Sequence, residues 1–146
     1  MSSLRHRNLA LLLLQARESV MAEFRPLLNE HGLTEQQWRV IRALLQDGPL
    51  EPRQLCECCQ IVSPSLTGVL ARMEELDLVK RERMPGDQRR LLISLTPRSK
   101  RIAAKMAPHV EARYAAMERE LGPELTAQLY ATLDALLERL GKGRAA

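Results

Sequence analysis

The sequence predicts a mainly α-helical protein with one small β-hairpin, arranged as a winged helix-turn-helix with long helices at both ends. Apolar residues recur every three or four positions along most of the chain, which is the period of a helix. The period changes to two over a single stretch, residues 79–96. Glycine and proline divide the chain so that a helix, a tight turn, a second helix and the hairpin follow one another.

The first predicted helix extends from Leu4 to about Glu30. It contains no glycine, and its apolar positions recur with helical spacing. We expect Pro26 to bend its last turns and Gly32 to end it in a left-handed cap.

The second predicted helix begins after Thr34 and ends at Gln46. Thr34 and Gln37 have the spacing of a capping box, in which each side chain bonds the other residue's backbone N–H. The residues expected to face the core are Trp38, Ile41, Leu44 and Leu45.

A short helix over residues 52–59 and a second one from Ser63 form the predicted helix-turn-helix. Ser63 is expected to be the N-cap, with Pro64 at the first helical position, where a missing N–H costs nothing. One face of this second helix is apolar (Leu66, Leu70, Met73 and Leu76), and the opposite face is small or polar (Ser65, Gly68, Ala71, Arg72 and Glu75).

Two strands, residues 79–84 and 90–96, are predicted to form a hairpin around a turn at residues 85–88. Two long helices follow, one from Thr96-Pro97 to about Glu120 and one after Gly122-Pro123. We interpret residues 1–146 as one domain, with the DNA-binding part at 33–96. The segments 4–31 and 97–141 carry more apolar surface than a small winged domain needs, so they are predicted to form a homodimer interface.

The positive charge is concentrated in the hairpin and the start of the next helix. The net charge is +4, yet residues 78–105 alone carry nine basic and two acidic side chains. A local basic block indicates a polyanionic partner, although a merely solvated charged face would have the same composition. Only four aromatic residues occur, which disfavours the stacking platforms of single-stranded nucleic acid binders. Double-stranded DNA is the predicted partner.

The residues expected to contact DNA lie on the second helix of the helix-turn-helix and on the hairpin. The helix offers short hydroxyls at its N-terminus, which reaches base edges in this fold, and an arginine two turns on. In the hairpin, an arginine can enter a narrow minor groove. An aspartate two residues away can pair with it and define the turn, or can form only a weak surface ion pair with it. The predicted contacts are Ser63, Pro64, Ser65, Thr67, Arg72, Asp87, Arg89 and Arg90.

The hairpin also carries a family resemblance. Asp87-x-Arg89 followed by Leu91-Leu92-Ile93-Ser94-Leu95-Thr96 resembles the wing of MarR-family regulators, whose helix order fits nearly the whole chain. Other segments resemble the subgroup of that family that represses operons for homoprotocatechuate (3,4-dihydroxyphenylacetate) breakdown; these are residues 13–18, 24–26, 33–39, 64–68 and 72–74. Two positions depart from the wider family: Asp77 replaces a helix-ending glycine, and Gly68 replaces a larger residue.

The resemblance implies a transcriptional repressor that a small phenolic acid releases from a pseudo-palindromic operator. Such a ligand needs a cation for its carboxylate and an apolar wall for its ring. Arg17, in an otherwise apolar helix, is the first candidate for the cation, and Trp38 with Arg39 or Arg42 could supply the wall and a second donor. Arg17 could instead pair with Glu18 or a partner-chain acid, and Trp38 could be plain core.

A different class of function would use Cys56, Cys58 and Cys59 as a redox or metal sensor on the same scaffold. A zinc site would need a further ligand, and the nearest histidines, His31 and His109, are far away in sequence. Cys56 and Cys59 share a helical face but cannot form a disulfide without distortion. A helical adaptor without a DNA role is a further alternative, which the basic hairpin disfavours.

No catalytic motif, phosphate loop or metal-binding spacing occurs, so we expect neither enzymatic activity nor a cofactor. No run of apolar residues approaches the roughly twenty that span a bilayer. The apolar run at residues 9–14 is too short for a signal peptide and lacks a cleavage site. We therefore expect a cytoplasmic protein without a membrane partner.

Overall fold

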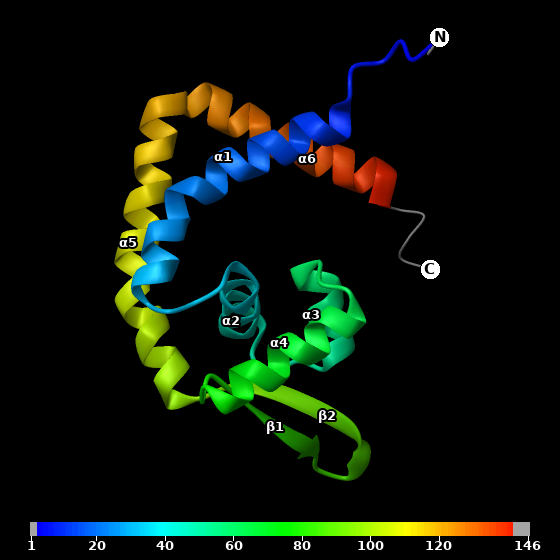
Figure 1. Cartoon of the computed structure of the whole chain (residues 1–146), viewed down its shortest axis with the longest axis vertical. Coiled ribbons are helices and arrows are strands. Elements are labelled where there is room, and N and C mark those ends of the chain that lie inside the picture. Colours follow the sequence, from blue (N-terminus) through cyan, green and yellow to red (C-terminus); the bar gives the residue numbers. More distant parts are fainter. Residues whose placement is uncertain (1–2, 142–146) are drawn as a thin grey trace. The chain divides into compact units, whose positions relative to one another are not determined.

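The computed structural model describes residues 3–141 and contains six helices and one two-stranded antiparallel sheet over these residues. The elements follow in the order α1 (Leu9–Glu30), α2 (Glu35–Asp47), α3 (Pro52–Cys59), α4 (Ser63–Glu75), β1 (Val79–Met84), β2 (Asp87–Leu95), α5 (Pro97–Leu121) and α6 (Pro123–Gly141), as Figure 1 shows. The predicted mainly α winged helix-turn-helix is confirmed.

The chain divides into two compact units, residues 1–108 and 109–146, each described here by itself. The division falls inside α5 immediately after Pro108, which the helix accommodates. In the first unit, α2 contacts α1, α3, α4 and β2, and α4 contacts β1. Helix α2 is therefore the element around which the helix-turn-helix and the hairpin are assembled.

The core of the first unit consists of aliphatic side chains from successive elements. The most deeply buried are Val40 and Ile41 of α2, Leu55 of α3, Leu66 and Met73 of α4, Ile93 of β2 and Met106 of α5. Leu45, which the sequence placed in the core, is 48% exposed. It follows Leu44 directly, and adjacent residues on a helix point about 100° apart, so only one of the pair reaches the core.

Most helix boundaries follow the predicted capping chemistry. Thr34 and Gln37 form the expected capping box, with reciprocal bonds of 3.1 and 3.0 Å. Thr96 and Ser99 make the same kind of reciprocal contact at the start of α5. The first helix begins later than predicted, at Leu9 rather than Leu4, because the Asn8 side chain accepts a hydrogen bond from the backbone N–H of Leu11.

Helix α4 is bounded by two non-glycine residues in the left-handed region. Gln60 (φ 53°) ends α3 and begins the turn into α4, and Asp77 (φ 56°) follows α4. The left-handed conformation of Asp77 is the one expected from the resemblance, which implies a helix-ending glycine at this position. The prediction that Ser63 caps α4 is wrong: Val62 is the N-cap residue, its carbonyl accepts from Leu66 N–H at 2.9 Å, and Ser63 is the first helical residue.

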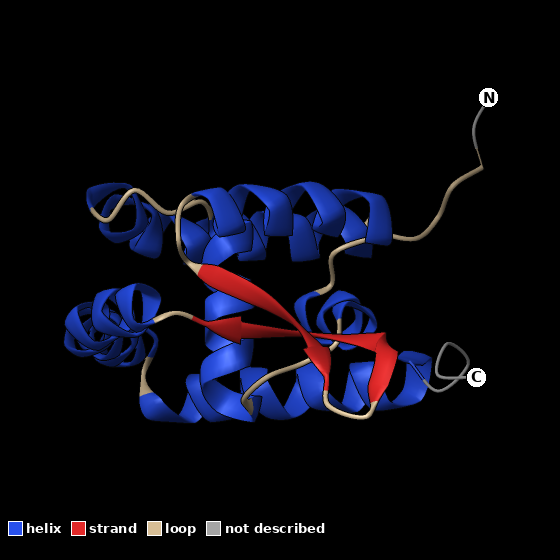
Figure 2. Cartoon of the chain, turned by 90° about the horizontal axis from the view of Figure 1, so that it is seen from below, coloured by secondary structure: helices blue, strands red, loops and turns tan. Residues whose placement is uncertain are grey.

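The hairpin is longer on its second strand than expected, since β2 begins at Asp87 instead of Arg90. Strand pairing runs regularly from Val79↔Leu95 to Arg83↔Leu91 and then jumps to Met84↔Asp87. Residues 88–90 therefore have no partner on β1, which is an irregularity of the bulge type. A single antiparallel bridge also joins Leu50, just before α3, to Ile93. Figure 2 shows the twisted hairpin in red.

Candidate nucleic-acid interface and effector site

Helix α4 buries one face and exposes the other, as predicted. Leu66, Leu70 and Met73 are buried, and the exposed side includes four of the predicted DNA-contacting residues (Ser63, Pro64, Ser65 and Thr67). The Thr67 hydroxyl donates to the Ser63 carbonyl at 3.1 Å and keeps its acceptor capacity. The sequence interpretation overlooked Val62, whose side chain is 69% exposed at the head of this helix.

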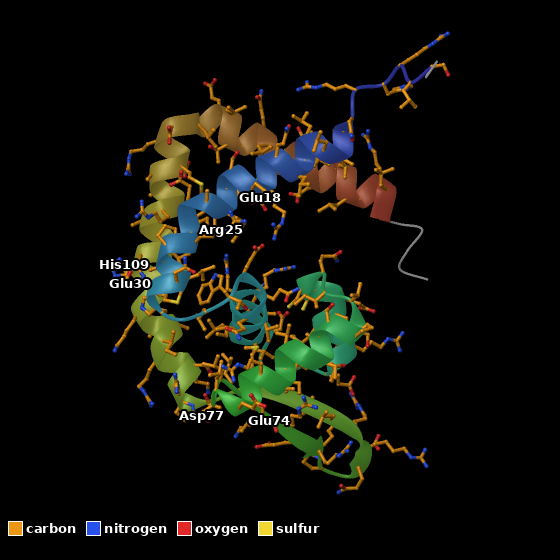
Figure 3. The ribbon with its side chains drawn as sticks, in the orientation of Figure 1. Glu18, Arg25, Glu30, Glu74, Asp77 and His109 are labelled. Atoms are coloured by element: carbon orange, nitrogen blue, oxygen red, sulfur yellow. The ribbon has the colours of Figure 1, made fainter. Side chains whose placement is uncertain are left out.

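The C-terminal half of α4 is tied to the hairpin by charge. Arg81 of β1 pairs with Glu74 of α4 at 2.8 Å, and Glu74 and Asp77 lie near each other at the end of the helix (Figure 3). Arg72 pairs within the helix with Glu75 at 3.1 Å, and both side chains are more than 60% exposed. Exposed pairs of this kind are weak, so Arg72 can exchange Glu75 for a phosphate or a base at small cost.

The hairpin tip does not contain the predicted ion pair between Asp87 and Arg89. Instead, the backbone N–H of Arg89 donates to Asp87 Oδ1 at 3.0 Å. A short aspartate side chain reaches the backbone two residues ahead more readily than a guanidinium, which is the usual Asx-turn geometry. Asp87 therefore shapes the turn, and the exposed Arg89 side chain makes no hydrogen bond or ion pair within residues 3–141.

Arg90 contacts a residue outside the hairpin. Its Nε donates to Glu51 Oε1 at 2.6 Å, across 39 positions of sequence. The hydrogen bond and the charge of Glu51 raise the pKa of Arg90 further above its ordinary value. Of the two wing arginines, then, Arg90 is held by the residue that precedes α3, and sequence spacing gave no indication of this pair.

Arg17 contacts α2 through an acidic residue. Its guanidinium pairs with Glu18 on its own helix and with Glu35 at the start of α2. Arg25 also binds Glu18, at 2.7 Å, and Figure 3 shows both residues on α1. The open alternative that Arg17 pairs with Glu18 is thus confirmed, and Glu35 is a second carboxylate that the sequence did not indicate.

Trp38 and Arg42 follow Glu35 on one face of α2, at spacings of three and four residues. Trp38 is half-buried, and Arg42 is exposed. Arg17, Trp38 and Arg42 therefore belong to one region of the first unit. Arg17 reaches this region from α1 through its ion pair with Glu35, and Trp38 and Arg42 follow Glu35 on the same face of α2.

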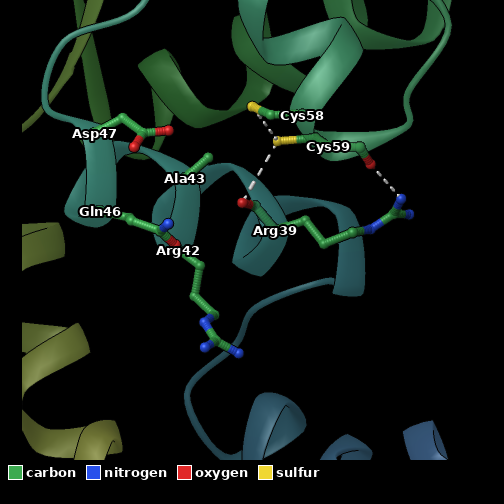
Figure 4. A pocket seen from close by; sticks show the side chains of 7 residues that line it. All are labelled: Arg39, Arg42, Ala43, Gln46, Asp47, Cys58 and Cys59. Carbon is green, nitrogen blue, oxygen red and sulfur yellow. Dashed lines mark hydrogen bonds between the residues drawn. The ribbon is translucent and has the colours of Figure 1, made fainter. Parts of the chain in front are cut away.

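A pocket of about 340 Å³ lies between α2 and α3 (Figure 4). It is lined by Arg39, Arg42, Ala43, Gln46, Asp47, Cys58 and Cys59, so both arginines that the sequence offered as the second donor reach it, whereas Arg17 and Trp38 are not among its lining residues. Figure 4 shows the Arg42 side chain pointing away from the two cysteines. Arg42 is thus the residue shared by the pocket and the Glu35–Arg42 face.

Arg39 is a structural residue. Its Nη1 donates to the Cys59 carbonyl at 2.6 Å and to the Gln60 carbonyl at 3.5 Å, which fixes the turn between α3 and α4. Burial and the nearby charge of Arg17 lower its pKa from the ordinary value. The periodicity of α2 suggests only a half-buried position, so this contact could not be found without the fold.

The three cysteines differ in accessibility: Cys58 is exposed, Cys56 is half-buried and Cys59 is buried. Burial, followed by the neighbouring Cys58, raises the pKa of Cys59 to about 12, which leaves almost no nucleophilic thiolate at neutral pH. Within residues 3–141, no three His, Cys, Asp or Glu side chains are close enough together to hold a metal ion. These observations do not favour the cysteine-sensor alternative.

Over residues 3–141, no helix combines the length and the apolar character that crossing a bilayer requires.

Residues 31–90, which contain α2 to the start of β2, match the model of the MarR family. The homoprotocatechuate degradative operon repressor of Escherichia coli is 39% identical over 95% of this chain and 93% of its own length. The solved structure of the transcriptional regulator PA4135 is 46% identical with a TM-score of 0.86, covering 91% of this chain and 98% of that one.

A second solved structure, NadR in complex with 4-hydroxyphenylacetate, is 38% identical with a TM-score of 0.79 and covers 93% of this chain and 96% of that one. These relatives are transcriptional regulators and not enzymes. Fold, helix order and similarity along nearly the full length agree, and the chain belongs to the MarR family of winged helix-turn-helix transcriptional regulators.

Proposed function

We propose that this protein is a cytoplasmic homodimeric repressor of an operon for the breakdown of hydroxyphenylacetic acids, and that a phenolic acid of this type releases it from its operator. The similarity to a homoprotocatechuate operon repressor over 95% of the chain carries the proposal. The relative whose structure contains 4-hydroxyphenylacetate supports the same ligand class.

The DNA contacts are proposed for the exposed face of α4 and for the wing. Ser65 and Thr67 stand near the N-terminus of α4, the part of a recognition helix that meets base edges, and Ser63 and Pro64 begin the helix. Arg72 follows two turns later. Arg89 is the candidate for the flanking minor groove, because its guanidinium is exposed and is not held by Asp87.

The homodimer is proposed from the apolar surface that α1 and α6 expose. Helix α6 has no buried residue, and Leu125, Leu129, Leu137 and Leu140 are between 44 and 71% exposed. On α1, Leu9, Leu11 and Leu14 are about half exposed. A second copy covering these leucines would remove them from water and would match the two-fold symmetry of a pseudo-palindromic operator.

For the effector, the contacts of Arg17 and the lining of the pocket support an order of candidates that differs from the one based on sequence. Arg17 already contacts two carboxylates, so an incoming carboxylate would have to displace Glu18 or Glu35. Arg42 lines the pocket between α2 and α3 and lies one turn from Trp38, whose ring can cover the aromatic face of the ligand. We therefore propose Arg42 as the carboxylate partner, with Trp38 as the wall and Arg17 as the residue that positions Glu35.

The test is a gel shift on the DNA upstream of the protein's own gene, titrated with 4-hydroxyphenylacetate and with homoprotocatechuate. Release by either acid, with no release by phenylacetate at the same concentration, is the expected result because phenylacetate lacks the phenolic hydroxyl. Tight binding that neither acid reverses would disprove the effector proposal, and the absence of any specific shift would disprove the repressor.

A further inference from the structure

The segment of the wing that carries Arg89 and Arg90 is not fixed by the hairpin itself. Pairing jumps from Arg83↔Leu91 to Met84↔Asp87, so residues 88–90 have no partner on β1. Within this segment the backbone N–H of Arg89 is restrained locally by its bond to Asp87. A bulged segment can point its side chains in more than one direction, so a further contact is needed to define them.

Glu51 supplies that contact from the segment that precedes α3, which pairs with β2 through Leu50. It is the N-cap residue of α3, and its own N–H is held by the Gln54 side chain at 2.9 Å. The neighbouring Leu50 exchanges two backbone hydrogen bonds with Ile93, of 3.1 and 2.8 Å, and Ile93 is completely buried. The backbone at Glu51 is therefore fixed on both sides, so its carboxylate can restrain a side chain of the wing.

We propose that Glu51 is a positioning residue for DNA binding, which holds the Arg90 guanidinium and thereby fixes the unpaired segment 88–90 so that Arg89 is presented to the minor groove. The single Nε–Oε1 bond of 2.6 Å leaves the two Nη groups of Arg90 available for a phosphate. The inference rests on the proposed DNA-binding function and adds a residue that no sequence motif indicated.

The negative charge of the Glu51 side chain makes this inference testable. Glu51 is acidic in a protein whose partner is a polyanion, so electrostatics alone predicts that removing its charge tightens DNA binding. A positioning role predicts the opposite for the operator. Glu57 is the matched control: it is an exposed glutamate of α3, six residues after Glu51, and no ion pair of its side chain occurs among residues 3–141.

The experiment compares Glu51→Gln and Glu57→Gln in the full-length protein. Glu51→Gln should weaken binding to the full operator about threefold to fivefold, in keeping with an exposed but anchored pair, and Glu57→Gln should leave it unchanged or slightly tighter. On a duplex trimmed so that the wings have no DNA to contact, the two variants should bind alike. Combining Glu51→Gln with Arg90→Gln should cost no more than Arg90→Gln alone.

A DNA-independent measurement separates this inference from the proposed function. Trypsin cleaves the peptide bonds after Arg89 and Arg90. If Glu51 restrains residues 88–90, these two peptide bonds should be cleaved faster in Glu51→Gln than in wild type or in Glu57→Gln. Equal cleavage rates, or operator binding by Glu51→Gln as tight as wild type, would overturn the positioning role. Wild-type protein that binds no operator would instead refute the repressor proposal and leave the cleavage result to decide on Glu51.

Discussion

Arg39 and Cys59 form two reciprocal hydrogen bonds, in each of which the side chain of one residue donates to the backbone carbonyl of the other. The Arg39 guanidinium donates to the Cys59 carbonyl at 2.6 Å, and the Cys59 thiol donates to the Arg39 carbonyl at 3.5 Å. The first bond has its acceptor at the last residue of α3, and the second has its acceptor within α2. The pair therefore fixes α2 against the turn from which α4 starts, and it keeps the Cys59 sulfur buried and protonated.

The raised pKa of Cys59 predicts a loss of stability in alkali. The unfolded thiol ionises near pH 9 and the folded one near 12, so between these values the unfolded state has fewer bound protons and is favoured as the pH rises. Denaturant unfolding should show a steeper decline of the free energy of unfolding from pH 9 upward in wild type than in Cys59→Ala. Parallel curves for the two proteins would contradict the assignment.

The same burial predicts the order of thiol labelling. At pH 8 in the native protein, iodoacetamide should modify the exposed Cys58 first and leave Cys59 unmodified until the protein unfolds. Peptide mass spectrometry after brief labelling measures this order. Early modification of Cys59 would show that α3 opens away from Arg39 in the native state.

Replacing Arg89 by alanine should weaken operator binding by about 1–3 kcal/mol without unfolding the dimer, since its side chain is exposed and makes no ion pair among residues 3–141. Arg119→Ala, at an exposed arginine in the last turn of α5, removes the same charge outside the winged unit and should change binding little. An unchanged gel-shift midpoint for Arg89→Ala would exclude the wing from operator recognition.

We expect replacement of Gly68 by alanine to change stability and DNA binding in opposite directions. It occupies the exposed face of α4, and a Cβ built there meets no atom within 4 Å. Gly68→Ala should therefore stabilise the protein by about 0.5–1 kcal/mol through helix propensity. If the glycine lets the α4 backbone approach DNA closely, operator affinity should fall at the same time; a variant that is more stable and binds equally well would refute the close approach.

The effector proposal predicts different consequences for two arginines. Arg42→Gln should bind the operator normally yet lose release by 4-hydroxyphenylacetate, whereas Arg17→Gln should retain a weaker response because Arg17 acts through Glu35. Arg25→Gln, which removes a partner of Glu18 on the same helix, is the control. Full release of the Arg42→Gln complex at the wild-type ligand concentration would place the carboxylate site elsewhere.

The dimer proposal predicts that Leu129→Glu dissociates the protein, because the leucine is 44% exposed in one chain and a charge would be costly in an apolar interface. Sedimentation velocity distinguishes the two states. A chain ending at Gly122 should likewise form monomers or aggregates. An intact dimer in either case would contradict the role assigned to α6.

The sequence was sufficient for the elements but not for the contacts between them. Periodicity and capping chemistry placed the helices, since the signals at Thr34, Gln37 and Thr96 are local. The pair Glu51–Arg90 spans 39 residues and the contact Arg39–Cys59 spans 20, so neither leaves a pattern in a short window. Asp87 shapes the turn as predicted, but its partner is the backbone N–H of Arg89 and not the guanidinium, because the choice between the two depends on turn geometry.

Finally, the two left-handed residues on either side of α4 restrict which substitutions the chain tolerates. A β-branched side chain at position 60 or 77 would clash with its own backbone, whereas glycine, asparagine or aspartate would be accepted. Substitutions on the exposed face of α4 meet no such barrier. If α4 is the helix that contacts the operator, as proposed, the residues on its exposed face can therefore vary with the DNA sequence while the two turns that set the direction of the helix stay the same.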